Sequence, residues 1–107
     1  MIVVATDGES GKGWCVGPWN SSVPVAVGYS DVGVAEDHVH DHMNEVYLVA
    51  RGSATLIVAG REVGLGRGDV LVVEPGEEHT FVSTSADYSH FVVQAPFVSG
   101  DKRLTLP

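Results

Sequence analysis

The sequence predicts a single all-β domain, a sandwich or barrel of short strands. Hydrophobic residues make up 44% of the 107 residues, and many are valines, whose β-branched side chains favour strands. Turn-forming residues, including 13 glycines and 5 prolines, separate short apolar segments at intervals of about eight to twelve residues. No segment of about ten residues or more shows helical periodicity. At this length we expect one hydrophobic core and one domain, residues 1–107.

Each strand is predicted from an apolar or alternating run that ends at a turn signal. In chain order these runs are residues 14–16, 23–29, 32–40, 46–50, 54–59, 70–73, 79–83 and 89–94. Between them lie turn-forming segments such as Gly66-Arg67-Gly68-Asp69 and Glu74-Pro75-Gly76.

The two ends of the chain are less regular. Residues 1–6 form a short apolar run, and the segment from Gly8 to Lys12 follows it. This segment lacks the full pattern of a phosphate-binding loop, so we interpret it as a turn. Residues 100–107 are predicted to be a loose tail or a strand that pairs with a neighbour.

Composition restricts the compartment and the partners. Six basic and fourteen acidic residues give a net charge of −8, which repels phosphate backbones and argues against nucleic acid as a partner. Cys15 is the single cysteine, so no internal disulfide can form, and we interpret it as a small, partly buried hydrophobic residue. No basic region precedes the N-terminal apolar run, and no apolar run approaches the ~20 residues of a membrane span. We expect a soluble, cytoplasmic protein.

Four residues are predicted to bind a metal ion. His38 and His40 are two residues apart, so on a strand both side chains leave the same face. Glu45 and His79 add a carboxylate and a third imidazole. These four donors suit one divalent transition metal (Mn, Fe, Ni, Co, Cu or Zn). On an octahedral ion they would leave about two coordination positions for water, dioxygen or substrate. Buried without a partner, the same groups would cost several kcal/mol.

The spacing of these residues resembles the two motifs of the cupin family, in its small single-domain form (cupin 2 conserved barrel type). The first motif, about residues 33–52, is matched at His38, His40, Glu45 and Gly52. The second, about residues 68–83, is matched at Gly68, Gly76 and His79. The resemblance implies a double-stranded β-helix, or jelly-roll barrel.

Three positions depart from the family pattern. Gly33 lies one place too close to His38, Pro75 is displaced by one, and Ser83 replaces an asparagine. These departures affect turns and not the four metal-binding positions.

Residues two positions from a ligand on the same strand should also face the cavity, which makes Glu36, Tyr47 and Phe81 candidate lining residues. Glu36 is either a general base or a solvated carboxylate at a strand end. Tyr47 could donate a hydrogen bond to a substrate oxygen or fill the barrel, and these two are the candidate catalytic residues.

His42 forms a second His-x-His pair with His40, but that register leaves only two residues before Glu45. His42 is therefore interpreted as an exposed residue at the barrel mouth, or as a group that faces a ligand or the substrate. His90 is predicted to be structural. Trp14 and Trp19 either cover one mouth or pack in a subunit interface.

The predicted function is that of a metal-dependent enzyme acting on a small oxygen-bearing organic molecule. The resemblance does not choose among dioxygenase, decarboxylase, lyase and isomerase chemistry. The alternative is a non-catalytic metal-binding, ligand-binding or sensor module. No acid–base residue stands out beyond the ligands, which favours the module, whereas no DNA-binding segment is present, which argues against a sensor.

Exposed sheet edges and apolar residues such as Val46, Leu48 and the run from Met1 to Ala5 predict a homodimer. We expect an N-terminal strand to pair with the partner's sheet.

Overall fold

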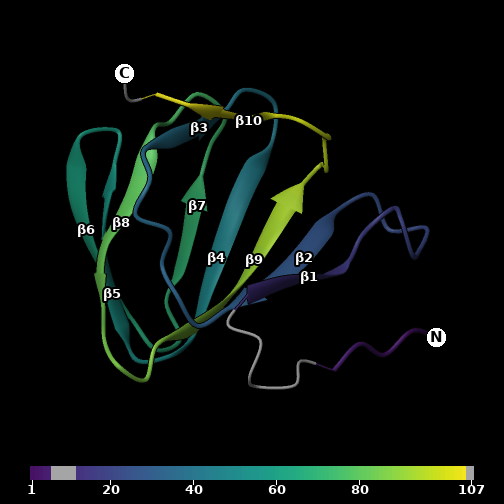
Figure 1. The fold of residues 1–107 in the computed structure, drawn as a ribbon, viewed down its shortest axis with the longest axis horizontal. Helices are drawn as coiled ribbons and strands as arrows, with labels where there is room; N and C mark the ends of the chain where they lie inside the picture. The colour runs from purple at the N-terminus through teal and green to yellow at the C-terminus, as the bar shows by residue number, and fades with distance from the viewer. Residues whose placement is uncertain (6–11, 106–107) are drawn as a thin grey trace.

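A computed structural model describes residues 1–5 and 12–105, and these contain ten strands and no helix (Figure 1). The strands are β1 (Lys12–Val16), β2 (Ala26–Ser30), β3 (His38–His40), β4 (Asn44–Arg51), β5 (Ser53–Val58), β6 (Arg61–Gly66), β7 (Val70–Val73), β8 (His79–Thr84), β9 (Ser89–Ala95) and β10 (Lys102–Leu104). The all-β prediction is confirmed. The turn expected after Gly8 lies outside the described residues. Within the described part of the chain, no helix is long and apolar enough to span a membrane.

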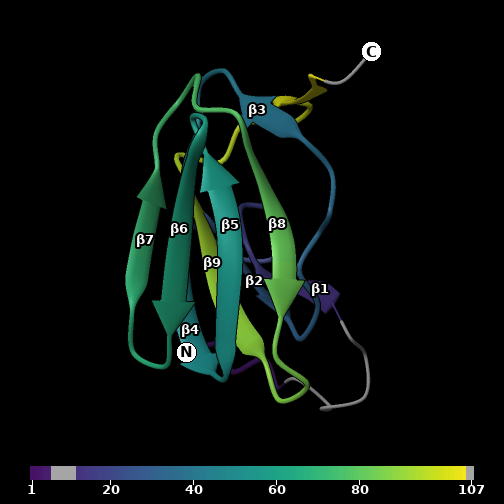
Figure 2. The ribbon, with the colours of Figure 1, turned by 90° about the vertical axis from the view of Figure 1, so that its left-hand side faces the viewer.

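The strands form two antiparallel sheets of five strands each. One sheet has the order β1-β2-β9-β4-β7, and we call it sheet A; the other, sheet B, has the order β10-β3-β8-β5-β6. Figure 2 shows β6, β5 and β8 side by side in sheet B, with β9 and β2 of sheet A behind them. Apart from the paired strands β1–β2 and β5–β6, consecutive strands alternate between the two sheets, as in a jelly-roll barrel.

Inward-facing side chains of both sheets form the core. Strand β4 alternates: Glu45, Tyr47 and Val49 are buried, while Leu48 is exposed on the opposite face. The buried apolar cluster comprises Tyr47, Val49, Ala54, Leu56, Val58, Leu65, Val73, Phe81, Tyr88 and Val92. Because Glu45 and Tyr47 continue the same face as Val49, the polar site borders this core directly.

Strand pairing brings the two motifs together. His38 of β3 lies opposite His79 of β8, and the Gly76 N–H donates to the His40 carbonyl at 2.8 Å. Gly76 has φ +83°, a conformation that L side chains rarely adopt. Gly52 has φ +71°, and a Cβ there would lie 2.3 Å from the Ser85 Oγ. These motif glycines are therefore required by the turns.

The structure corrects some strand predictions. The strand expected over residues 32–40 is wrong except for His38–His40, because the chain crosses from sheet A to sheet B before it. Strand β6 was not predicted; it is an edge strand whose half-buried face carries only Val63 and Leu65 between glycines and charged residues. The C-terminal segment forms β10, which pairs with β3 of the same chain. Residues 1–5 are exposed and are not part of a strand in the single chain.

Candidate metal centre

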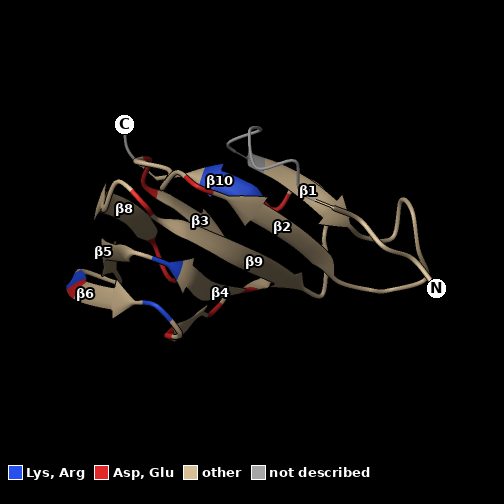
Figure 3. Cartoon of the chain, turned by 90° about the horizontal axis from the view of Figure 1, so that it is seen from below, with Lys and Arg blue, Asp and Glu red and all other residues tan. Residues whose placement is uncertain are grey.

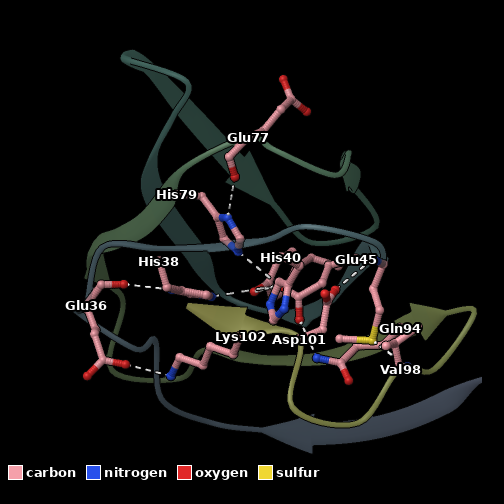
Figure 4. A network of polar contacts seen from close by, with 12 residues as sticks. Glu36, His38, His40, Glu45, Glu77, His79, Gln94, Val98, Asp101 and Lys102 are labelled. Atoms are coloured by element: carbon pink, nitrogen blue, oxygen red, sulfur yellow. Dashed lines mark hydrogen bonds and ion pairs between the residues drawn. The ribbon is translucent and has the colours of Figure 1, made fainter. Parts of the chain in front are cut away.

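The side chains of His38, His40, Glu45 and His79 meet at one point between the sheets (Figure 4). One possible ligand atom from each residue lies within 4.8 Å of the others, and all four residues are buried. Strands β3 and β8 of sheet B supply the three imidazoles, and β4 of sheet A supplies the carboxylate. The predicted four residues are therefore brought together, with donors arriving from two opposite sides.

The three imidazoles converge on one carboxylate oxygen. The Glu45 Oε1 atom lies 2.9 Å from His79 Nε2, 3.0 Å from His40 Nε2 and 3.9 Å from His38 Nε2. A single oxygen cannot accept a well-aligned hydrogen bond from each of three crowded rings. The arrangement is more typical of donors that share a cation.

Main-chain carbonyls determine the tautomers of two of these rings. The Nδ1 atom of His38 lies 2.7 Å from the Glu36 carbonyl, and the Nδ1 atom of His79 lies 3.0 Å from the Glu77 carbonyl. A carbonyl only accepts, so each Nδ1 must carry the proton. In the neutral ring the lone pair is then on Nε2, the atom that faces the cluster. This arrangement is how proteins commonly orient imidazole ligands toward a metal.

His40 supplies the most direct indication of a missing partner. It is 4% exposed, and neither of its ring nitrogens has a hydrogen-bond partner among the described residues. Its Nε2 is close to Glu45 Oε1, but the angle does not make a hydrogen bond. Buried polar atoms are normally satisfied, so this nitrogen requires an explanation. A cation in the cluster would provide one.

The Glu45 carboxyl is held in its charged form. Burial alone would raise its pKa, but the imidazoles of His38, His40 and His79 around it lower the pKa well below the ordinary value. A carboxylate together with imidazoles is a donor set that divalent transition metals prefer. The residues present therefore fit a metal ion.

Two further side chains hold this carboxylate. The Gln94 Nε2 atom donates to Glu45 Oε2 at 3.0 Å, and the Tyr47 hydroxyl donates to Glu45 Oε1 at 3.1 Å. Burial and then the charge of Glu45 raise the pKa of Tyr47, so its hydroxyl stays protonated and able to donate. Sequence reasoning missed Gln94. The available signal was an amide at an inward-facing position of a strand, on the same face as Val92 and His90.

A cavity of about 260 Å³ opens beside the cluster. The four-residue cluster contributes His38, His40 and Glu45 to its lining, and Gln94 and Lys102 also line it. Apolar walls come from residues that include Val34, Tyr47, Phe81 and Val92. The site thus combines convergent polar groups with a space that suits a small organic molecule.

The family that matches the chain is described as the cupin domain, and the match covers residues 29–94, which is more than half of the sequence. The chain belongs to the cupin family. A search of curated proteins found no match to this cupin.

Solved structures share the fold of this cupin. A cupin 2 conserved barrel domain protein from Salinispora arenicola is 19% identical, with a TM-score of 0.68 and coverage of 88% of this chain and 87% of that chain. A variant of Streptomyces PAC13 with uridine is 20% identical, with a TM-score of 0.69 and coverage of 92% and 81%; Pac13 is described as a nucleoside dehydratase. KdgF from Halomonas sp. is 18% identical, with a TM-score of 0.65 and coverage of 88% and 86%. At these identities the likeness is one of fold.

The candidate residues beyond the four-residue cluster occupy different places in this cupin. Tyr47 and Phe81 line the cavity and contact each other edge to face, with ring centroids 5.5 Å apart. Glu36 precedes β3, and its half-exposed carboxylate lies 2.6 Å from Lys102 Nζ. The strand alternation that predicted Glu36 to line the cavity does not extend to it, because residues 31–37 are not part of a strand.

The remaining histidines and tryptophans lie around the cluster. The side chain of His42 is 73% exposed in the turn between β3 and β4, and its Nδ1 lies 2.8 Å from Asp101. His90 is buried on β9, contacts the Tyr88 hydroxyl through Nδ1 and lines the cavity. Trp14 lines the same cavity, and Trp19 lines a second, neighbouring one.

Proposed function

We propose that this cupin is a metal-dependent enzyme that acts on a small organic substrate through its oxygen atoms. The observation that carries the proposal is the buried His40 ring, whose two nitrogens lack hydrogen-bond partners while Nε2 faces Glu45 Oε1 at 3.0 Å. His38, His40, Glu45 and His79 would hold the ion. Proteins do not ordinarily keep three imidazoles and a carboxylate buried together unless a cation offsets the cost of desolvation.

When bound, a divalent transition metal supplies Lewis-acid or redox chemistry at the substrate oxygens. The chain itself positions the ligands and shields the reacting groups. Gln94 and Tyr47 restrain the two oxygens of Glu45, and the carbonyls of Glu36 and Glu77 orient two imidazoles. The buried Phe81 ring excludes water from one wall of the cavity.

Within this proposal, Tyr47 and Glu36 are the candidate catalytic residues. The Tyr47 hydroxyl borders the cavity and could orient a substrate oxygen. Glu36 could act as a general base only after its carboxylate leaves Lys102. Among the four reaction classes, lyase chemistry is the first to assay, because a protein of the same fold is described as a nucleoside dehydratase. Dioxygenase, decarboxylase and isomerase assays follow.

The metal is tested by elemental analysis of purified protein after incubation with Mn, Fe, Co, Ni, Cu or Zn salts. We expect about one ion per chain, with four protein donors about 2.0–2.3 Å from it. Replacing His40 with alanine should remove the ion, whereas His42→Ala should retain it because His42 is exposed and bound to Asp101. A wild-type protein without metal, or a His42→Ala variant that alone loses it, contradicts the proposal.

Tyr47→Phe separates an enzyme from a binding module. This substitution keeps the barrel filled and removes one hydroxyl, so at saturating metal it should lower turnover ~10–1000-fold with metal content unchanged. A metal-loaded protein that binds small diols, keto acids or sugars but converts none of them, with or without dioxygen, would instead be a non-catalytic module.

We also propose that the enzyme works in the cytoplasm as a homodimer. The single cysteine supports a reducing compartment. The apolar outer face of sheet A, where valines of β2, β9, β4 and β7 are aligned, supports the dimer.

A further inference from the structure

We propose that the substrate is a small carboxylic acid with an apolar body, and that Lys102 binds its carboxylate. The inference rests on the proposed function, since it describes what the metal-bearing cavity accepts. It is drawn from the position, charge and partner of Lys102 and from the walls of a second cavity next to the first.

Strand pairing places Lys102 on the same face as a candidate metal ligand. Lys102 of β10 lies directly opposite His40 of β3 in the antiparallel pair. Side chains of residues directly opposite each other project from the same face, with their Cβ atoms about 4.5–5.5 Å apart. Figure 4 shows the Lys102 side chain running below the His38 and His40 rings, and β10 is the basic strand beside β3 in Figure 3.

Lys102 borders two adjoining cavities. The inner cavity is the one beside the cluster, and the outer cavity has a volume of about 480 Å³. Both are lined by Lys102, His40, Gln94 and Trp14. Among the described residues that line either cavity, Lys102 is the only lysine or arginine. A ligand that extends from one cavity to the other would therefore pass this ammonium group.

Lys102 already binds a carboxylate in the structure. Its Nζ lies 2.6 Å from Glu36 Oε1, and the two side chains are 45% and 43% exposed. Ion pairs this exposed are weak and exchange readily. A substrate carboxylate can replace the Glu36 carboxylate on the same ammonium, which is an exchange of like groups.

The charge of the two cavities favours an anionic ligand. Glu45 would neutralise only part of a divalent ion, and Lys102 adds a second positive group at the cavity wall. Asp101 also lines the outer cavity, but its carboxylate is occupied by the backbone N–H groups of His42 and Met43 and by the His42 ring. A phosphate presents three terminal oxygens, and Lys102 is the single lysine or arginine among the described residues of the two linings, so a carboxylate matches the available donors better.

Aromatic side chains form the walls of the outer cavity. Trp19 and Phe97 contact each other edge to face, with ring centroids 5.6 Å apart. Trp14 lines both cavities, and its ring packs against Gly28. A Cβ at position 28 would lie 2.8 Å from the Trp14 ring, so glycine provides room for it. Met43 and Val98 complete an apolar surface that suits an aromatic or branched body.

The test uses metal-loaded protein and two matched pairs of probes: mandelate with mandelamide, and 2-hydroxyisovalerate with its amide. Each pair differs in the carboxylate charge and shares the apolar body. Calorimetry should show each acid binding about tenfold more tightly than its amide, the gain of one charge-assisted contact. Phenyl phosphate should bind no more tightly than mandelate.

Substitutions assign the preference to Lys102. Lys102→Met should remove the difference between acid and amide, Lys102→Arg should keep it, and Glu36→Gln should keep or increase acid binding. Arg103→Met is the matched control, because Arg103 is next on β10 and pairs with Asp41 outside both cavities. Metal content and thermal unfolding are measured for every variant.

The possible failures are distinguishable. A wild-type protein that takes up no metal overturns the proposed function. A metal-loaded protein that binds amide as tightly as acid, binds neither acid at millimolar concentration, or keeps its preference in Lys102→Met overturns the inference about Lys102. Tighter binding of phenyl phosphate than of mandelate also overturns it, and would indicate that the cavity accepts a phosphate ester instead of a carboxylate.

Discussion

At the scale of single residues, the two oxygens of Glu45 have different neighbours. Oε1 faces the imidazoles and the Tyr47 hydroxyl, whereas Oε2 accepts a hydrogen bond from Gln94. Gln94 holds the carboxylate from the neighbouring strand β9, because Glu45 and Gln94 lie opposite each other in sheet A. It is therefore a positioning residue for the candidate ligand.

Replacing Gln94 with methionine keeps the length of the side chain and removes its amide. We expect metal affinity to fall ~10–100-fold, the effect typical of losing a group that orients a ligand. Competition with a chelator measures it. Asn44→Ala is the control, since the Asn44 side chain bonds the Ala95 carbonyl in the same sheet and not the cluster. Equal affinity in Gln94→Met and wild type would contradict the assignment.

The candidate ligand residues were predictable because local spacing encodes them. His38 and His40 are two residues apart on one strand, and the motif spacing added Glu45 and His79. Gln94 was not predictable in this way, because it lies 49 residues from Glu45 and reaches it only through the pairing of β4 with β9. Lys102 likewise gains its position only from pairing with β3.

At the scale of elements, the turn between β3 and β4 is tied to the segment before β10. The Asp101 carboxylate accepts the His42 and Met43 N–H groups at 3.0 and 2.9 Å and the His42 ring at 2.8 Å. Burial would raise the pKa of Asp101, but these hydrogen bonds lower it to about 2. The contact holds the end of β3, which carries His40, and the start of β10, which carries Lys102.

Asp101→Asn should lower the melting temperature by several degrees at neutral pH, because the amide is uncharged and cannot accept all three bonds. A carboxyl whose pKa is lower in the folded state stabilises the fold above its unfolded pKa of 3.8. That stabilisation is lost as pH falls through the folded value of about 2. The gap between wild type and variant should therefore close from about pH 4 to pH 2.

Thermal unfolding followed by circular dichroism across this pH range measures the gap. Glu62→Gln, an exposed change on edge strand β6, should match wild type throughout. A gap between Asp101→Asn and wild type that stays constant down to pH 2 would show that charge is not the cause.

The strands themselves were predicted unevenly for a physical reason. Strands β4, β5 and β9 lie inside their sheets and show clear alternation or continuous apolar character. Edge strands β6 and β10 bury one face at most, so their sequences show little of the hydrophobic periodicity from which strands are predicted. The crossing before β3 looked like a strand because Val34, Glu36 and His38 are spaced two residues apart. In the structure residues 31–37 form no strand, although the Phe81 N–H donates to the Val34 carbonyl at 3.2 Å.

At the scale of the whole molecule, the outer face of sheet A is a continuous apolar surface. Strand register aligns two rows across four strands: Tyr29, Phe91, Leu48 and Val70 in one, and Val27, Val93, Val46 and Val72 in the other. Neither row contains a charged side chain, and Val70 and Val72 are 57% and 49% exposed. Monomeric proteins rarely expose an apolar patch this continuous. A second copy of the chain is the proposed cover.

Light scattering at tens of micromolar should give the mass of a dimer, and Val72→Glu should convert it to a monomer by placing a charge in the apolar face. Val82→Glu is the matched control, since Val82 is a similarly exposed valine (55%) on β8 of sheet B. Removing residues 1–5 tests the N-terminal strand in the same assay. A monomeric wild type, or dissociation by Val82→Glu alone, contradicts this arrangement.

The division of the four donors between the sheets has a mechanical consequence. Three imidazoles belong to sheet B and the carboxylate to sheet A, so an ion held by all four would cross-link the two layers. Such a link closes the barrel much as a covalent bridge would, without a cysteine pair. Loss of the ion would remove this link, so the two layers should part at that end more often in the metal-free protein.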